Sequence, residues 1–200
     1  PVYREEEPVS TRDAFGNGVV RLAHRYPNLV GLDGEVGNST RLQALQTSFP
    51  DRFFQMFVAE QNMVGMAMGL ARRGQIPVVS SFGAFLTRAF DQVRMNQYSG
   101  PNIKYVGSHA GVSVGEDGPS QMGLEDLALF RSVQDGVVLY PCDAISCERL
   151  LERTLEHEGM VYLRTTREPT PHIYSPEASF EIGGPSVLRS SGEDVATVVA

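Results

Sequence analysis

The sequence is poor in basic residues, cysteine and long apolar runs, and each shortage excludes a class of protein. The 17 Lys and Arg residues face 24 Asp and Glu residues, so the net charge is −7 and the basic footprint of a nucleic-acid-binding protein is missing. No apolar run reaches membrane-spanning length, and no basic amphipathic stretch suggests membrane binding. The two cysteines, Cys142 and Cys147, fit neither a disulfide framework nor a zinc-ligand set. We therefore expect a protein of a reducing, cytoplasmic compartment.

What is present is ordinary for a folded globular protein, with 42% apolar and 20% charged residues. A chain of 200 residues is long enough for one large domain with its own core. It opens in a charged stretch, PVYREEEPVS, and stops in the apolar run DVATVVA. We interpret these ends as those of a piece cut from a longer polypeptide.

Short apolar runs alternate with helical patterns six times along the chain. The expected strands are residues 28–32, 52–58, 76–80, 103–106, 137–140 and 160–164. The expected helices are residues 11–25, 40–46, 60–73, 82–97, 124–132 and 143–157, and a β-hairpin is expected at 180–188. This alternation predicts an α/β fold with three layers, α/β/α, around a six-stranded, mostly parallel sheet.

Parallel sheets bind ligands outside the carboxyl ends of their strands, so the residues after each strand are the candidates for a site. Glu60 follows the apolar string FFQMFVA and precedes NMVGMAMG. Desolvation in such surroundings favours the neutral form of a carboxylic acid, which can then exchange a proton near neutral pH. The alternative is a glutamate at a helix start that interacts only with the helix dipole.

The other candidates at this edge are aromatic or suited to anions. Phe82 and Phe85 lie three residues apart and could stack on a flat heterocycle, although core packing explains the same spacing. His109 stands in the glycine-rich segment GSHAGVSVGEDGPSQMG, which is too long for a simple connection and is no P-loop, because no Gly-Lys-Ser/Thr follows. Three arginines could pair with phosphate or could be ordinary surface residues: Arg12, Arg164 and Arg167. The residues alone indicate an anion-suited edge without naming a cofactor.

Five strings, in order between residues 12 and 167, resemble segments of one family. They are GLDGEVGNST, VAEQNMVGMAMGLA, SSFGAFLTRAFDQVRM, GSHAGVSVGEDGPSQMGLEDLALFRS and RTTREP. The fourth is the strongest match and is almost continuous. On these motifs the chain resembles the pyrimidine-binding, or central, domain of transketolases.

The resemblance implies an activity and a cofactor. Transketolases use thiamine diphosphate and Mg²⁺ to move a two-carbon ketol unit from a ketose phosphate to an aldose phosphate in the pentose phosphate pathway. The cofactor binds at a dimer interface, where a different domain holds the diphosphate and the metal. The aminopyrimidine ring enters the domain that this chain resembles. There a glutamate hydrogen-bonds the ring nitrogen and so helps to deprotonate the thiazolium carbon.

The motifs also imply roles for single residues. Glu60 would be the proton-relay acid, Phe85 would stack on the aminopyrimidine with Phe82 beside it, and Gln121 would face the thiamine. Five residues would contact the sugar phosphate, with His109 also taking part in catalysis: Arg12, Ser39, His109, Asp117 and Arg167.

The chain departs from the family pattern at three positions. Glu35 stands where the family often has aspartate at the dimer interface. Some transketolases have histidine in place of Gln121 and tyrosine in place of Arg88, which leaves the part of Gln121 in proton transfer open.

The family's metal motif, Gly-Asp-Gly with a downstream asparagine, is missing from the sequence. We therefore expect the Mg²⁺ and diphosphate ligands in another domain or chain, a homodimer in the full enzyme, and an inactive isolated chain. We assign residues 1–175 to the pyrimidine-binding domain and residues 176–200 to a linker hairpin and the first strand of a C-terminal domain.

Two alternatives stay open. One is another thiamine diphosphate enzyme, a deoxyxylulose-phosphate synthase or a 2-oxo acid dehydrogenase β-type chain, although NST at 38–40 together with SHAGVSVGEDGPSQ favours transketolase. The other is a transketolase-like interaction module without catalysis, against which the retained Glu60, His109 and phenylalanines argue.

Overall fold

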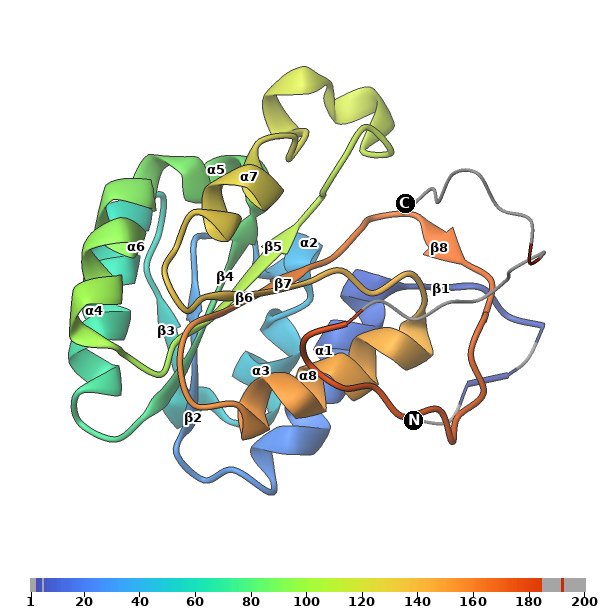
Figure 1. The fold of residues 1–200 in the computed structure, drawn as a ribbon, viewed down its shortest axis with the longest axis horizontal. Helices are drawn as coiled ribbons and strands as arrows, with labels where there is room; N and C mark the ends of the chain where they lie inside the picture. The colour runs from blue at the N-terminus through green and yellow to red at the C-terminus, as the bar shows by residue number, and fades with distance from the viewer. Residues whose placement is uncertain (1–2, 5, 185–191, 193–200) are drawn as a thin grey trace.

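The centre of the protein is a six-stranded sheet in which all neighbouring strands are parallel (Figure 1). A computed structural model describes residues 3–4, 6–184 and 192. The strand order is β3-β2-β4-β5-β7-β6. The strands are β2 (Leu29–Asp33), β3 (Phe53–Gln55), β4 (Ile76–Phe82), β5 (Lys104–Ser108), β6 (Val137–Leu139) and β7 (Val161–Arg164). The predicted α/β fold with six parallel strands is confirmed.

Helices cover both faces of this sheet, which completes the three predicted layers (Figure 1). One face carries α1 (Thr11–Ala23), α3 (Gln43–Ser48) and α8 (Ala144–Glu156). The other carries α4 (Glu60–Ala71), α5 (Gly83–Leu86), α6 (Phe90–Asn96) and α7 (Asp126–Arg131). Side chains alternate along each strand, so Leu29 joins the first core and Val30 the second.

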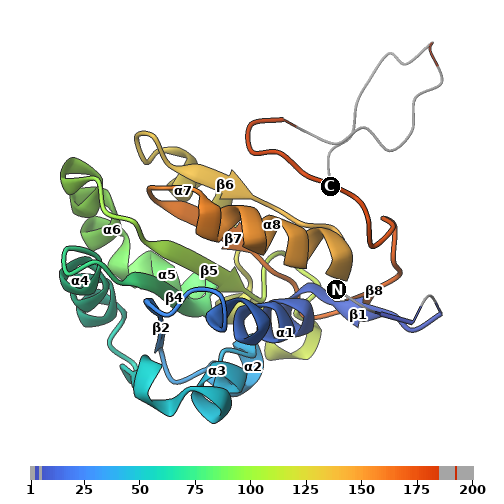
Figure 2. The same ribbon diagram turned by 90° about the horizontal axis from the view of Figure 1, so that it is seen from below.

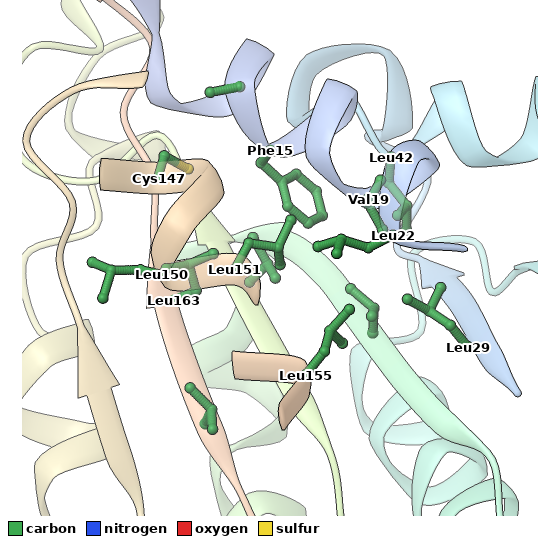
Figure 3. Packing of buried hydrophobic residues seen from close by; sticks show 14 of the residues in the cluster. Phe15, Val19, Leu22, Leu29, Leu42, Cys147, Leu150, Leu151, Leu155 and Leu163 are labelled. Carbon is green, nitrogen blue, oxygen red and sulfur yellow. The ribbon is translucent and has the colours of Figure 1, made fainter. Parts of the chain in front are cut away.

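The first core is closed by the contact of α1 with α8 (Figure 3). Phe15, Val19 and Leu22 of α1 face Leu151 of α8, and all four side chains are fully buried. Loss of a buried ring such as that of Phe15 costs about 3–5 kcal/mol in comparable cores. This packing fixes the start of α1, and with it Arg12, relative to the sheet.

Two helices begin at side-chain caps. The Ser10 hydroxyl accepts a hydrogen bond from the Asp13 backbone N–H at 3.1 Å at the start of α1. At α8, Asp143 and Ser146 form a reciprocal capping box. Because Ser10 precedes Arg12 by only two residues, the first cap also fixes the backbone from which the arginine side chain extends.

Several predicted elements differ in detail from the structure. The helix expected at 82–97 begins one residue later, since β4 keeps pairing with β5 as far as Phe82. It is also divided into α5, the 3₁₀ turn η2 (Thr87–Ala89), α6 and η3 (Gln97–Ser99). The helix expected at 40–46 is replaced by α2 (Gly37–Thr40) and α3, because Arg41 between them has a left-handed φ of 74°. The strand expected at 52–58 is shorter and follows a 3₁₀ turn, η1 (Pro50–Arg52).

A small antiparallel pair that the sequence did not predict joins the two ends of the domain. It consists of β1 (Val9–Ser10) and β8 (Pro169–Thr170), which lie side by side next to the start of α1 (Figure 2). The pair brings the segment after β7 back to the start of the first helix. Arg12 and Arg167, far apart in the sequence, are therefore held on neighbouring segments.

The segment after residue 175 is only partly described. Residues 180–184 form no strand, and the rest of the hairpin expected at 180–188 lies outside the described residues. Arg149 and Arg153 of α8 donate hydrogen bonds to the carbonyls of Pro176 and Phe180 at 2.5 and 3.1 Å. The domain boundary at residue 175 stays a prediction. Within the described part of the chain, no helix is long and apolar enough to cross a membrane.

Candidate active site

The predicted site residues gather where the parallel strands end. Glu60 comes after β3, Phe82 ends β4, His109 follows β5 and Arg167 follows β7. Between β5 and α7 the chain makes a long excursion, residues 110–123, which extends beyond the sheet (Figure 1). This excursion contains two short 3₁₀ turns, η4 (Gly115–Asp117) and η5 (Pro119–Gln121).

Glu60 is the first residue of α4 and is buried, with 2% of its surface exposed. Its surroundings are less apolar than the sequence predicted, because Arg88 donates from its NH1 to Glu60 Oε1 at 2.6 Å. The Arg88 side chain is 53% exposed, so the ion pair reaches from the buried carboxylate to solvent. Burial places the carboxylate where an N–H donor can bind it without competition from bulk water.

Three aromatic rings stack beside this carboxylate. Phe82 stacks on Phe85 with ring centroids 4.9 Å apart and an interplanar angle of 10°. Phe82 also stacks on His109, at 3.8 Å and 13°. The Arg88 guanidinium lies over the Phe85 ring, 5.3 Å from its centroid. The stack therefore connects the Glu60 end of the site with the His109 end.

His109 is held in a strained and desolvated position. Its φ is 57°, in the left-handed region that non-glycine residues rarely adopt. Its Nδ1 lies 3.0 Å from Ser108 Oγ, and its Nε2 lies 3.5 Å from Arg12 NH1. Burial, together with the positive charges of Arg12 and Arg167, lowers the pKa of His109 to about 4. The imidazole is thus neutral at pH 7 and surrounded by cations.

The arginines and polar residues predicted for the anion end lie around this imidazole. Arg12 NH1 donates to the Ser39 carbonyl at 3.0 Å. Arg167 NH1 lies 3.2 Å from Asp117 Oδ2 and donates to the Val114 carbonyl at 2.9 Å. Two guanidinium groups beside a neutral histidine suit a phosphate group.

The glycine-rich excursion is closed at its base by backbone contacts. Ala110 and Gly123 form a β-bridge, and the Gly123 N–H donates to the His109 carbonyl at 3.3 Å. The turn η5, which carries Gln121, packs against α5, which carries Phe85. The excursion therefore brings Asp117 and Gln121 toward the same edge as His109.

Arg164 is not an anion-binding residue, in contrast to one interpretation of the sequence. It is buried, its Nε donates to Asp126 Oδ2 at 2.8 Å, and its NH2 donates to the Gly123 carbonyl at 2.9 Å. Tyr162 donates its hydroxyl to the same Asp126 oxygen at 2.6 Å. This buried network anchors the end of the excursion rather than a ligand.

Sequence reasoning missed a polar cluster at the ends of β2 and β4. Asp33 is fully buried, its Oδ2 accepts from the Val36 N–H at 3.1 Å, and burial raises its pKa. Its Oδ1 and the hydroxyls of Ser80 and Ser81 have no hydrogen-bond partner among the described residues. Buried polar atoms without partners are rare, so they mark this edge as suited to polar ligand atoms. Glu35, by contrast, is exposed, and its N–H donates to Gln55 Oε1 at 3.1 Å.

Two further findings concern a nearby cavity and possible metal ligands. A cavity of about 250 Å³ lies between α1 and the α2–α3 segment and is lined by residues that include Asp13, Asn38 and Arg41, but by neither Glu60 nor His109. Among the described residues, no group of three or more His, Cys, Asp or Glu side chains could hold a metal ion.

Comparison with known families confirms the resemblance that the sequence motifs indicated. The sequence model of the family described as "Transketolase, pyrimidine binding domain" matches residues 7–172. The chain belongs to the transketolase pyrimidine-binding domain family. Transketolase-like protein 2 from Mus musculus is 48% identical over 200 residues, and transketolase from Homo sapiens is 43% identical over the same length. Each match covers 100% of this chain but 32% of the relative, so the transketolase domain spans about a third of these curated relatives.

Solved transketolase structures share the fold. The structure described as "Split gene transketolase, inactive beta4 tetramer" has a TM-score of 0.82 and 37% identity, covering 92% of this chain and 60% of that chain. Transketolase from Leishmania mexicana has a TM-score of 0.78 and 25% identity, covering 86% of this chain and 27% of that one. The three-layer arrangement of the transketolase domain is therefore that of known family members.

Proposed function

We propose that this transketolase domain supplies the pyrimidine-binding half of an active site that transfers a two-carbon ketol unit from a ketose phosphate to an aldose phosphate. The observation that carries the proposal is the buried carboxylate of Glu60, which lies beside the aromatic stack of Phe82 and Phe85 at the carboxyl edge of the sheet. Membership of the family supports thiamine diphosphate as the cofactor. When bound, that cofactor supplies the carbanion chemistry, while the protein binds, orients and polarises it.

The residues present fit the aminopyrimidine end of this cofactor. A buried carboxylate can accept a hydrogen bond from a ring nitrogen and hold or release a proton there. Phe85 offers a ring face for a flat heterocycle, and Phe82 supports Phe85 from behind by stacking on it. Gln121, on the turn that packs against α5, would approach the thiamine. The unpaired buried oxygens of Ser80 and Ser81 add acceptors at the same edge.

The cationic end fits the phosphate of a sugar substrate. Arg12 and Arg167 would pair with phosphate oxygens, with Ser39 beside Arg12. The neutral imidazole of His109 would hydrogen-bond the sugar and orient it toward the cofactor. Asp117, which pairs with Arg167, suits a sugar hydroxyl. These assignments place substrate and cofactor at opposite ends of the aromatic stack.

The complete enzyme would need further parts. We propose that a diphosphate-binding domain or chain holds the diphosphate and Mg²⁺, and that the assembly contains a homodimer in the cytoplasm. The relative described as a split-gene transketolase supports a partner chain as one arrangement. Phe57 and Val58, which are 62% and 67% exposed just before Glu60, support a protein interface beside the acid.

Replacement of Glu60 by alanine tests this function in the complete enzyme. We expect Glu60→Ala to fold normally and to lose most turnover with xylulose 5-phosphate and ribose 5-phosphate, because no acid then serves the ring nitrogen. Glu125→Ala is the matched control, since Glu125 is exposed at the start of another helix. Near-normal turnover in Glu60→Ala contradicts the proposal.

The same assay separates the alternatives. Turnover with pyruvate instead of sugar phosphates would indicate another thiamine diphosphate enzyme. If calorimetry shows no binding of thiamine diphosphate to the complete protein with Mg²⁺, a non-catalytic interaction module is the better account.

A further inference from the structure

Arg88 occupies both contacts that the proposed cofactor ring requires. It lies in the 3₁₀ turn η2, three residues after Phe85. Its NH1 is 2.6 Å from Glu60 Oε1, and its guanidinium carbon is 5.3 Å from the Phe85 ring centroid. Among the described residues, no other side chain donates a hydrogen bond to the Glu60 carboxylate.

A guanidinium and an aminopyrimidine are chemically similar ligands for such a pair. Both are flat and both lie favourably on an aromatic face, and the ring nitrogen, once protonated, presents an in-plane N–H donor as the guanidinium does. The guanidinium lies over Phe85 and approaches Glu60 Oε1, and a second flat group cannot take that place at the same time, although the carboxylate has further acceptor sites. Arg88 and the ring therefore compete for the same two partners, Glu60 and Phe85.

We propose that Arg88 is a further residue of the cofactor site: it holds Glu60 and Phe85 until the aminopyrimidine displaces it, and so sets the cofactor affinity. The inference rests on the proposed function. Because the Arg88 side chain is 53% exposed, it can leave toward solvent without crossing the core. Glu60 is 2% exposed, and an ionised carboxylate left buried without a donor is costly. Departure of the arginine and arrival of the ring are thus coupled, one donor replacing the other.

The exchange lowers the apparent affinity for the cofactor. When only a fraction of the protein is in the binding-competent state, the apparent dissociation constant equals the intrinsic one divided by that fraction. For an ion pair with one half-exposed partner, we expect a factor on the order of fivefold. Its removal should strengthen binding by the same factor.

The test is calorimetric titration of the complete protein, with its diphosphate-binding domain or chain, using thiamine diphosphate at a fixed Mg²⁺ concentration. We expect Arg88→Ala to bind the cofactor about fivefold more tightly, and Arg88→Gln to gain less because its amide still donates to the carboxylate. Arg94→Ala is the matched control and should bind as the unchanged protein does. Arg94 is also an exposed arginine in an ion pair, with Asp91 on α6.

A double-mutant cycle shows whether the effect passes through the carboxylate. The gain from Arg88→Ala should vanish in a Glu60→Gln background, where no ion pair forms. Unchanged or weaker binding by Arg88→Ala overturns the inference, and weaker binding would mean that the arginine contacts the bound cofactor. The proposed function is still supported in that case if Glu60→Gln weakens binding. Failure of the unchanged protein to bind the cofactor overturns both proposals.

Discussion

The depressed pKa of His109 predicts a specific dependence of stability on pH. The pKa falls from 6.5 to about 4 because the imidazole is buried and lies among the charges of Arg12 and Arg167. Between these two pH values His109 is protonated in the unfolded chain but not in the folded chain. The free energy of unfolding therefore rises with pH through this window and falls on acidification. The interval spans about 2.5 pH units at about 1.4 kcal/mol each, which gives an upper limit of about 3.5 kcal/mol.

Urea unfolding between pH 4 and 7.5 measures this effect when the unchanged protein is compared with His109→Asn. All other ionisable groups are the same in both proteins, so their contributions cancel in the difference. We expect the unchanged protein to lose more stability than the variant on acidification from pH 6.5 to 4. Parallel curves, or an imidazole that titrates near 6.5 by NMR, refute the reasoning.

Addition of an anion tests whether the neighbouring positive charges contribute to the low pKa of His109. Inorganic phosphate bound beside Arg12 and Arg167 stabilises the imidazolium and should raise the pKa of His109. Arg167→Ala should also raise it, because one of the neighbouring positive charges is removed. A pKa that responds to neither change would mean that burial alone causes the depression.

Three more predictions concern the substrate end and its support. Arg167→Ala should raise the Michaelis constant for sugar phosphates more than it weakens cofactor binding, as steady-state kinetics and calorimetry can show. Asp126→Ala leaves buried cationic and hydroxyl donors unpaired and should cost about 3–5 kcal/mol in urea unfolding. Gly107→Ala places a Cβ 2.1 Å from the Tyr162 hydroxyl and should destabilise by at least about 1–3 kcal/mol, whereas Gly65→Ala meets nothing within 4 Å and should be neutral or stabilising.

The sequence predicted the parts of the site that depend on strand ends. Glu60 and His109 each follow a short apolar run, and parallel strands bring such positions to one edge without further information. The sequence did not predict which side chains these residues contact. Arg88 and Glu60 are 28 residues apart on different elements, so no local pattern reports their ion pair.

Arg164 and Arg167 show the same limit. They lie three residues apart in one arginine-containing segment, and residue type gives no way to separate them. The structure separates them by burial, since Arg164 still belongs to β7 and points into the Asp126 network, whereas Arg167 has left the sheet. Asp33 was missed for a related reason, because an aspartate next to a glycine at the end of a strand is also typical of a turn.

The aromatic stack decides how cofactor and substrate can share this edge. Phe82 stacks on both Phe85 and His109, so it packs between the two ends of the site. The proposed aminopyrimidine would then use the face of Phe85 over which the Arg88 guanidinium lies, within reach of Glu60. The proposed sugar phosphate would then lie on the other side of the stack, among the arginines around His109. In the proposed function, the buried carboxylate of Glu60 and the cationic cluster would therefore act on different parts of the bound ligands, with the stacked rings between them.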